Sequence, residues 1–197
     1  MNVKLDGLTL HVEPDYNPPH PRTECDHFGK MLCWHRNYTF GDQNRYDTPE
    51  DFYRSEEAKN IYVSLPVYML DHSGTFLSTE GFSDVDPGRW DWGQIGIIYC
   101  TEEDAKQWFG YLPDKEMLKT QLNGEVECYN DYLNGAWYEY FIEGRNGEIK
   151  DSCGGICTRC LISSPRKPKA EIICEGNYDG RTIQSDRAYG GRIRRLC

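Results

Sequence analysis

The chain has 197 residues, of which 38% are hydrophobic, 27% charged and 13% aromatic, and its formal net charge is −10. This composition is typical of a globular protein with one domain-sized core, and it excludes disordered, collagen-like and coiled-coil chains. No run of 18 apolar residues is present that could span a membrane, and the first residues lack the apolar segment of a secretory signal. We therefore expect a cytoplasmic protein.

Local signals in the sequence predict an α+β fold. Thr48 can cap a helix whose first turn holds Pro49 and acidic residues. Pro66 lies within an apolar strand pattern, which indicates an edge strand or a bulge. The apolar run over 94–100 is typical of a buried central strand. We predict a mainly antiparallel sheet with two or three helices on one side. In chain order, the predicted elements are strands over 3–12 and 31–38, a helix over 48–59, strands over 61–70, 75–78 and 94–100, helices over 101–110 and 113–134, and strands over 136–143 and 148–153.

The apolar periodicity also predicts which residues form the core. Strand residues that alternate with polar ones, and helix residues spaced three or four apart, are expected to face one another across the sheet. The predicted core is Val63, Leu65, Val67, Ile95, Ile97, Ile98, Leu118, Leu122, Leu133, Phe141 and Ile142, with Cys100 and Cys128 as small apolar members.

The charge is distributed unevenly along the chain. Residues 158–197 hold nine Lys or Arg and four Asp or Glu, a net charge of +5, whereas the preceding residues hold 13 basic and 28 acidic side chains, a net charge of −15. We therefore predict an acidic α+β domain over 1–157 and a basic tail over 158–197. An acidic body attracts basic partners, and a basic tail attracts nucleic acid.

Four segments, in order along the chain, carry a resemblance to a known family. They lie over 25–42, 65–74, 90–101 and 124–155, and the third reads TrpAspTrpGlyGlnIleGlyIleIleTyrCysThr. The chain resembles a family of proteins from bacteriophages, prophages and related mobile elements. The resemblance implies an accessory protein in the bacterial host cytoplasm and supplies no catalytic residues. The family's usual third segment has a serine where Trp92 stands here, so this loop offers no serine nucleophile.

The nine cysteines suggest metal binding in the last part of the chain. An odd number of cysteines argues against a fully paired disulfide framework. Cys153, Cys157 and Cys160 lie within eight residues, and Cys174 follows fourteen positions later. Four thiolates can hold zinc tetrahedrally, and a zinc ion would staple a tail that cannot build its own core. The alternative is a loosely ordered tail without metal.

A second candidate metal site lies near the N-terminus. Cys25 and His27 are separated by one residue, as are Cys33 and His35, so each pair faces one side of an extended chain. The two pairs together could supply two thiolates and two imidazoles to one ion. Packing and hydrogen-bonding roles explain these residues equally well, and the resembled family typically has other residues at positions 25 and 27.

The pair Asp71 and His72 is the candidate for catalysis. A histidine beside a carboxylate can act as a general base. Neighbouring residues in a turn point apart, however, and the segment Asp71-His72-Ser73-Gly74 is also typical of a tight turn.

The pair of tryptophans Trp90 and Trp92, which flank Asp91, is the candidate for partner binding. Two tryptophans this close in the sequence suggest that one packs inward and that the other lies at a surface contact.

Two functional hypotheses follow from these patterns. The first is non-enzymatic binding of a host protein, in which an acidic surface imitates the phosphate backbone of nucleic acid. The alternative is a zinc-stapled nucleic-acid-binding protein that contacts phosphates through Arg192, Arg194 and Arg195. A hydrolase built around Asp71 and His72 ranks third.

Overall fold

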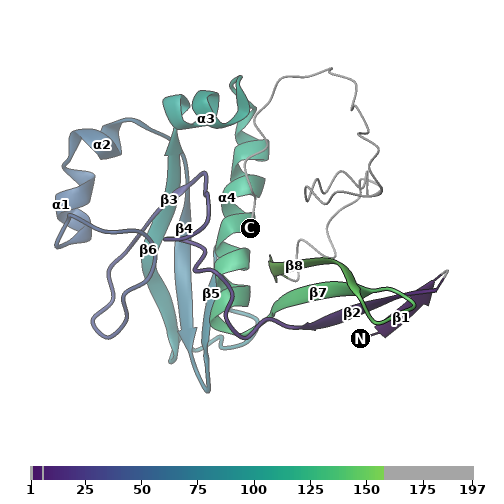
Figure 1. The fold of residues 1–197 in the computed structure, drawn as a ribbon. Coiled ribbons are helices and arrows are strands. Elements are labelled where there is room, and N and C mark those ends of the chain that lie inside the picture. Colours follow the sequence, from purple (N-terminus) through teal and green to yellow (C-terminus); the bar gives the residue numbers. More distant parts are fainter. Residues whose placement is uncertain (1, 6, 158–197) are drawn as a thin grey trace.

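The structure, a computed structural model, describes residues 2–5 and 7–157, and the basic tail over 158–197 lies outside the described residues. The described chain forms two antiparallel four-stranded sheets and four helices (Figure 1). The α+β prediction is confirmed at this level, but the strands form two sheets instead of one. In chain order, the elements are β1 (Asn2–Leu5), β2 (Leu8–Pro14), β3 (Lys30–Cys33), α1 (Pro49–Tyr53), α2 (Glu56–Lys59), β4 (Ile61–Asp71), β5 (Thr75–Ser78), β6 (Trp92–Thr101), α3 (Glu102–Phe109), α4 (Lys115–Leu133), β7 (Trp137–Glu143) and β8 (Ile149–Cys157).

The main sheet has the strand order β3-β6-β4-β5, and β6 is its buried central strand, as predicted. Successive residues of a strand point to opposite faces, so Ile97 and Ile98 enter different clusters. Ile98 packs in a cluster that includes residues of α3 and α4, whereas Ile97 packs with Leu32, Tyr99 and Phe52 of α1. Both faces of the main sheet are therefore covered, instead of the single face predicted.

The helices begin and end where their capping residues stand. Thr101 and Asp104 form a reciprocal capping box at the start of α3, and α3 stops at Gly110, which adopts the left-handed conformation at φ 79°. Asp114 caps α4 by accepting a hydrogen bond from the backbone of Met117. The predicted helix over 48–59 is divided into α1 and α2, because Ser55 caps a new helix.

One buried stripe of α4 packs against the main sheet. The stripe consists of Leu118, Leu122, Val126 and Tyr129. The predicted core is confirmed for these two leucines and for Val63, Val67, Ile95, Ile97, Ile98 and Cys100. Leu65, Leu133 and Cys128 are only partly buried.

Pro66 lies in an inner strand, yet it fits the reasoning that predicted an edge. The pairing of β4 with β5 begins only at Tyr68. At Pro66, β4 therefore has a neighbouring strand on one side only, which is β6, where Ile97 lies opposite Pro66. A proline lacks the N–H that a second partner strand would use.

The second sheet has the order β1-β2-β7-β8 and extends away from the main sheet (Figure 1). The predicted single strand over 3–12 is in fact the β1–β2 hairpin, which turns at Gly7 with φ 81°. The predictions that placed Phe141 and Ile142 in the main core are wrong. These residues pair with His11 and Leu10 of β2 and are half-buried.

A buried arginine fastens the N-terminal segment to α4. The side chain of Arg22 is 1% exposed; its Nε and one terminal nitrogen donate to the two carboxylate oxygens of Asp42 at 2.8 and 2.6 Å, and the other terminal nitrogen donates to Glu125 at 3.0 Å. Burial by itself lowers the pKa of Arg22, but Asp42 and Glu125 outweigh it and raise that pKa. Glu125 also accepts the backbone N–H groups of Phe28 and Gly29. This network sets the position of β3, because β3 begins at Lys30, the residue after Gly29.

Candidate functional site

The loop between β5 and β6 is folded around one carboxylate. We call residues 82–91 the Trp90 loop. The Asp86 carboxylate accepts the backbone N–H groups of Trp90 and Asp91 at 2.7 and 3.0 Å, and the Asp86 carbonyl accepts the indole N–H of Trp92 at 2.7 Å. Arg89 has φ 55° and lies over the Trp92 ring at 4.4 Å. These interactions give the loop a defined shape.

The two tryptophans divide as the sequence predicts. Trp90 is 87% exposed, whereas Trp92 is 8% exposed and packs against Tyr68 and Phe82. A Cβ atom at Gly88 would collide with the Trp90 indole, so the ring lies against the loop's own backbone. Trp92 therefore supports the loop from inside. Trp90 and Asp91, the other two predicted contact residues, are exposed.

The candidate catalytic residues Asp71 and His72 do not pair with each other. His72 Nδ1 lies 2.8 Å from the carboxylate of Asp91, and the Asp71 carboxylate accepts the hydroxyl of Tyr38 at 3.2 Å. His72 is 70% exposed. The pair of His72 and Asp91 thus joins the β4–β5 turn to the Trp90 loop.

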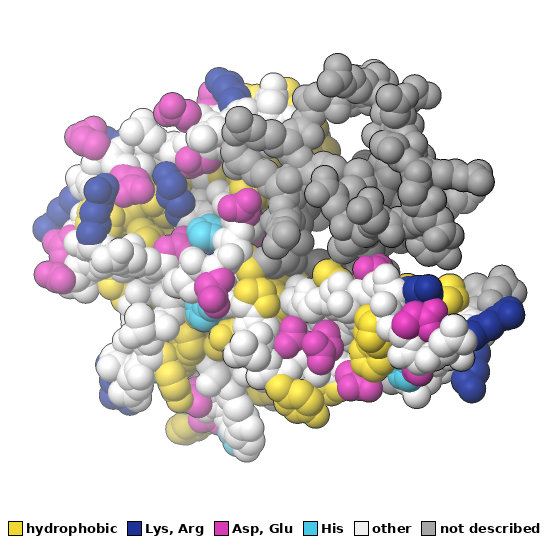
Figure 2. Space-filling view, viewed as in Figure 1, with side chains coloured by type: hydrophobic (Ala, Val, Ile, Leu, Met, Phe, Trp, Pro, Cys, Tyr) yellow, Lys and Arg dark blue, Asp and Glu magenta, His cyan; other side chains and the backbone are white. Residues whose placement is uncertain are grey.

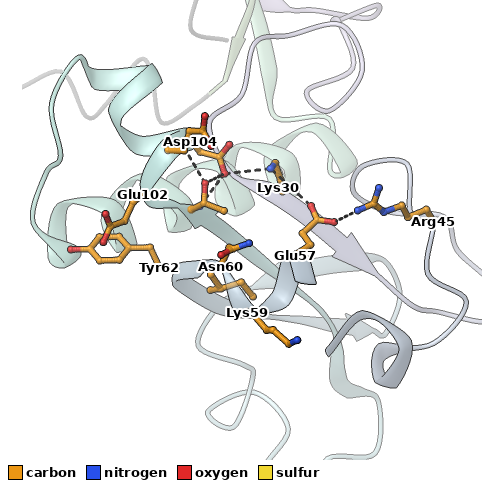
Figure 3. Close-up of a pocket in the computed structure, with 11 residues that line it drawn as sticks. Lys30, Arg45, Glu57, Lys59, Asn60, Tyr62, Glu102 and Asp104 are labelled. Atoms are coloured by element: carbon orange, nitrogen blue, oxygen red, sulfur yellow. Dashed lines mark hydrogen bonds and ion pairs between the residues drawn. The ribbon is translucent and has the colours of Figure 1, made fainter. Parts of the chain in front are cut away.

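A large charged pocket lies at the opposite end of β6, between α2 and the start of α3 (Figure 3). We call it the α2–α3 pocket; its volume is about 760 Å³. Sequence reasoning did not predict it, because no single motif carries it. Its lining residues are Lys30, Arg45, Glu57, Lys59, Asn60, Ile61, Tyr62, Thr101, Glu102, Glu103 and Asp104.

Glu57 lies at the centre of a hydrogen-bond network in this pocket. One carboxylate oxygen accepts the Tyr99 hydroxyl at 2.8 Å, and the other accepts the Tyr46 hydroxyl and the Arg45 guanidinium, each at 2.8 Å. Burial raises the pKa of Glu57, but the hydrogen bonds from Tyr99 and Tyr46 and the charges of Arg45 and Lys30 outweigh it and lower that pKa. Burial and the same carboxylate raise the pKa of Tyr99.

Lys30 bridges the two halves of the pocket. Its Nζ lies 3.4 Å from Asp104 and 4.0 Å from Glu57 (Figure 3). Burial raises the pKa of Asp104, but hydrogen bonds from Thr101 and the charge of Lys30 bring that pKa below its usual value. Both central carboxylates are thus ionised at neutral pH. They hold charges in place and are poor proton donors.

The two cysteines of the predicted zinc set that the structure describes point to opposite faces of the second sheet. Cys157 lies opposite Trp137, and Cys153 lies opposite Tyr140. Residues three apart on a strand face opposite sides, and directly paired residues share a side. A bulge in β8, where Gly155 has φ 71°, produces this arrangement. Cys160 and Cys174, like Arg192, Arg194 and Arg195, lie outside the described residues.

The second predicted metal set is not assembled either, because the Cys25 sulfur is held in a disulfide and is not a free thiolate. His27 bonds through Nδ1 to the carbonyl of Cys25 at 3.1 Å, and the His35 ring stacks on Tyr38. Burial raises the pKa of the Cys33 thiol to about 12. In the part of the chain that the structure describes, no three His, Cys, Asp or Glu side chains gather as ligands for a metal ion.

Comparison with known proteins identifies no relative. No protein-family model, no curated protein and no solved structure matches the chain. Among the described residues, the helices are too short or too polar to cross a bilayer.

Proposed function

We propose that this chain is a non-enzymatic phage accessory protein that binds a protein of its bacterial host through the Trp90 loop. The observation that carries the proposal is Trp90, a large apolar side chain that is 87% exposed on a loop held in one shape. Tryptophan is among the residues that most often dominate the energy of a protein–protein contact. A loop that is already ordered loses little entropy on binding.

The charge around Trp90 supports a basic partner. Asp84 and Asp91 are exposed on the same loop, and the residues before the tail carry a net charge of −15. Complementary charge accelerates the encounter of two proteins and suppresses wrong partners. We therefore propose a partner with an apolar pocket for Trp90, surrounded by Lys or Arg.

Imitation of nucleic acid receives less support than a contact centred on Trp90. Mimicry of a phosphate backbone requires a continuous row of acidic groups. Figure 2 shows acidic side chains interspersed with Lys and Arg over the end of the molecule that carries α1 and α2. The basic rim of the proposed partner agrees with a nucleic-acid-handling host protein without requiring mimicry.

The proposal is tested by capturing partners from the bacterial cytoplasm with three versions of the protein. Wild type and Tyr16→Ala should retain the same partner, because Tyr16 is an equally exposed aromatic residue that is not part of the Trp90 loop. Trp90→Ala should lose that partner without a change in melting temperature, since the Asp86 contacts remain.

A photo-crosslinking residue at Val85, which is 71% exposed on the same loop, should join covalently to the partner. Equal capture by Trp90→Ala and wild type, or crosslinking from position 16 instead of position 85, would overturn the proposal.

A further inference from the structure

We propose that the α2–α3 pocket binds a small zwitterion, an amino acid or an unblocked short peptide, with its ammonium group at Glu102 and Glu103 and its carboxylate at Arg45 and Lys59. The inference does not depend on the proposed protein contact, because β6 separates the two sites. Ten residues of β6 span about 30 Å. The pocket volume of about 760 Å³ lies within the range of small-molecule sites, about 300–1,000 Å³.

Outside the central network of Lys30, Glu57 and Asp104, the charged residues that line the pocket are separated by sign. Figure 3 shows Glu102 on one side, next to Tyr62, and Arg45 and Lys59 on the other side. Glu103 lines the pocket from α3 as well. A ligand with one positive and one negative end matches this separation, whereas a simple anion or cation matches only half of it.

The two carboxylates at the centre of the pocket already have partners. Lys30 contacts Asp104 and Glu57, and Glu57 accepts three further hydrogen bonds. The middle of the pocket therefore does not require an ionic group from the ligand. A peptide backbone or an aliphatic chain between the two charged ends fits this requirement.

The side chains at the two ends can exchange their present partners for a ligand. Lys59 pairs with Glu56 at 2.6 Å and Glu102 pairs with Lys106 at 3.3 Å, and all four side chains are at least half exposed. Exposed pairs of this kind contribute little to stability. Arg45 uses one terminal nitrogen for Glu57 and Tyr46, and a guanidinium carries five N–H donors.

The environment of Tyr62 indicates where an ammonium group binds. The register of β4 against β6 shifts between Ile61 and Val63, so Tyr62 is the extra residue of a bulge, and its side chain lines the pocket. Bulges often redirect a side chain at a binding site. The Lys115 ammonium already lies 4.5 Å from the centre of the Tyr62 ring. An aromatic face beside carboxylates attracts cations.

The test uses alanine peptides, whose only charges are their termini. L-Alanine and its di-, tri- and tetrapeptides are titrated into the full chain and followed by the amide resonances of Asn60, Tyr62 and Thr101. The series varies the distance between the termini, since each extended residue adds about 3.4 Å. We expect saturable shifts at these residues for at least one length. N-acetylation or C-amidation of that peptide should weaken binding by about tenfold or more.

Paired variants assign the two ends. Glu102→Gln with Glu103→Gln should weaken the unblocked peptide about tenfold and leave the acetylated peptide unchanged. Arg45→Gln with Lys59→Gln should also weaken the unblocked peptide about tenfold, and should leave the binding of the amidated peptide unchanged. Glu139→Gln on β7 is the control for the loss of an exposed acid, and Trp90→Ala should bind as wild type. The absence of saturable shifts, or equal binding of blocked and unblocked peptides, would overturn the inference.

Discussion

Replacement of Glu125 by Gln should destabilise the protein strongly, although the change is nearly isosteric. One Glu125 oxygen accepts the N–H of Phe28 at 2.7 Å, and the other accepts Gly29 N–H and Arg22, both at 3.0 Å. Every group that faces this carboxylate is a donor. Either orientation of a glutamine amide would direct its NH₂ at a donor, in a side chain that is 12% exposed.

The size of the effect follows from the burial of Arg22. Loss of one member of a buried ion pair costs about 3–5 kcal/mol. Arg22 keeps Asp42, so we expect the lower end, about 3 kcal/mol. With an m-value of about 2 kcal/mol/M, the urea midpoint should fall by about 1.5 M.

The matched control makes the same substitution on the same helix. Glu116 lies in the first turn of α4, 82% exposed, and pairs only with Lys119 at 2.8 Å among the described residues. Glu116→Gln should change the stability by less than about 0.5 kcal/mol. The midpoint is measured by tryptophan fluorescence. Similar urea midpoints for the two variants would refute the assignment of Glu125 as a buried anchor.

Three further substitutions test the core, a helix and the pocket. Ile97→Asp should prevent cooperative folding, because an unpaired buried charge costs several kcal/mol. Ile149→Asp, at an exposed position of β8, is the control and should fold. Thermal denaturation measures both. Gly124→Ala should stabilise α4 by about 0.5–1 kcal/mol in urea denaturation, since a Cβ there meets nothing within 4 Å. Folding lowers the pKa of Glu57, so its ionised form stabilises the native state. This contribution is fully present at a pH above the unfolded pKa of about 4.3, and it disappears as the pH falls through the folded pKa. Urea midpoints between about pH 5 and 3 should therefore fall more steeply for wild type than for Glu57→Gln; parallel curves would contradict this.

The features that could be predicted from the sequence are those set by neighbouring residues. The capping pair Thr101 and Asp104, and the apolar spacing of α4, act within a few residues of chain, and both helices lie where predicted. The division into two sheets depends on which strands pair. β2 pairs with β7, so that Thr9 lies opposite Glu143 across most of the chain, and no local pattern specifies that choice.

The sites differ from the sequence expectation for the same reason. The carboxylate that binds His72 is Asp91, nineteen residues away, and not the adjacent Asp71. The bulge in β8 turns Cys153 and Cys157 apart, although their spacing of four would place them together on a regular strand. The α2–α3 pocket draws its residues from β3, α2, β4, β6, α3 and the segment before α1, so only the folded chain reveals it.

Two glycines of β6 should respond to alanine with opposite signs. A Cβ at Gly96 would collide with the carbonyl oxygen of Leu32 and lie 2.9 Å from the Cα of Cys33, whereas a Cβ at Gly93 meets nothing within 4 Å. Gly93→Ala should raise stability by about 0.4–1 kcal/mol by restricting the unfolded chain. Gly96→Ala should cost about 1–3 kcal/mol, because β3 must move away from β6.

The displacement of β3 should also reach the α2–α3 pocket. Lys30, which bridges Glu57 and Asp104, begins the same strand and pairs with Tyr99 of β6. The amide resonances of Asn60 and Tyr62 should therefore shift in Gly96→Ala and remain in place in Gly93→Ala. Thermal denaturation measures the change in stability of each variant, since the melting temperature shifts by roughly 2–4 °C per kcal/mol for a chain of this size. Equal melting temperatures for the two variants would mean that β3 does not require the close approach that a glycine allows.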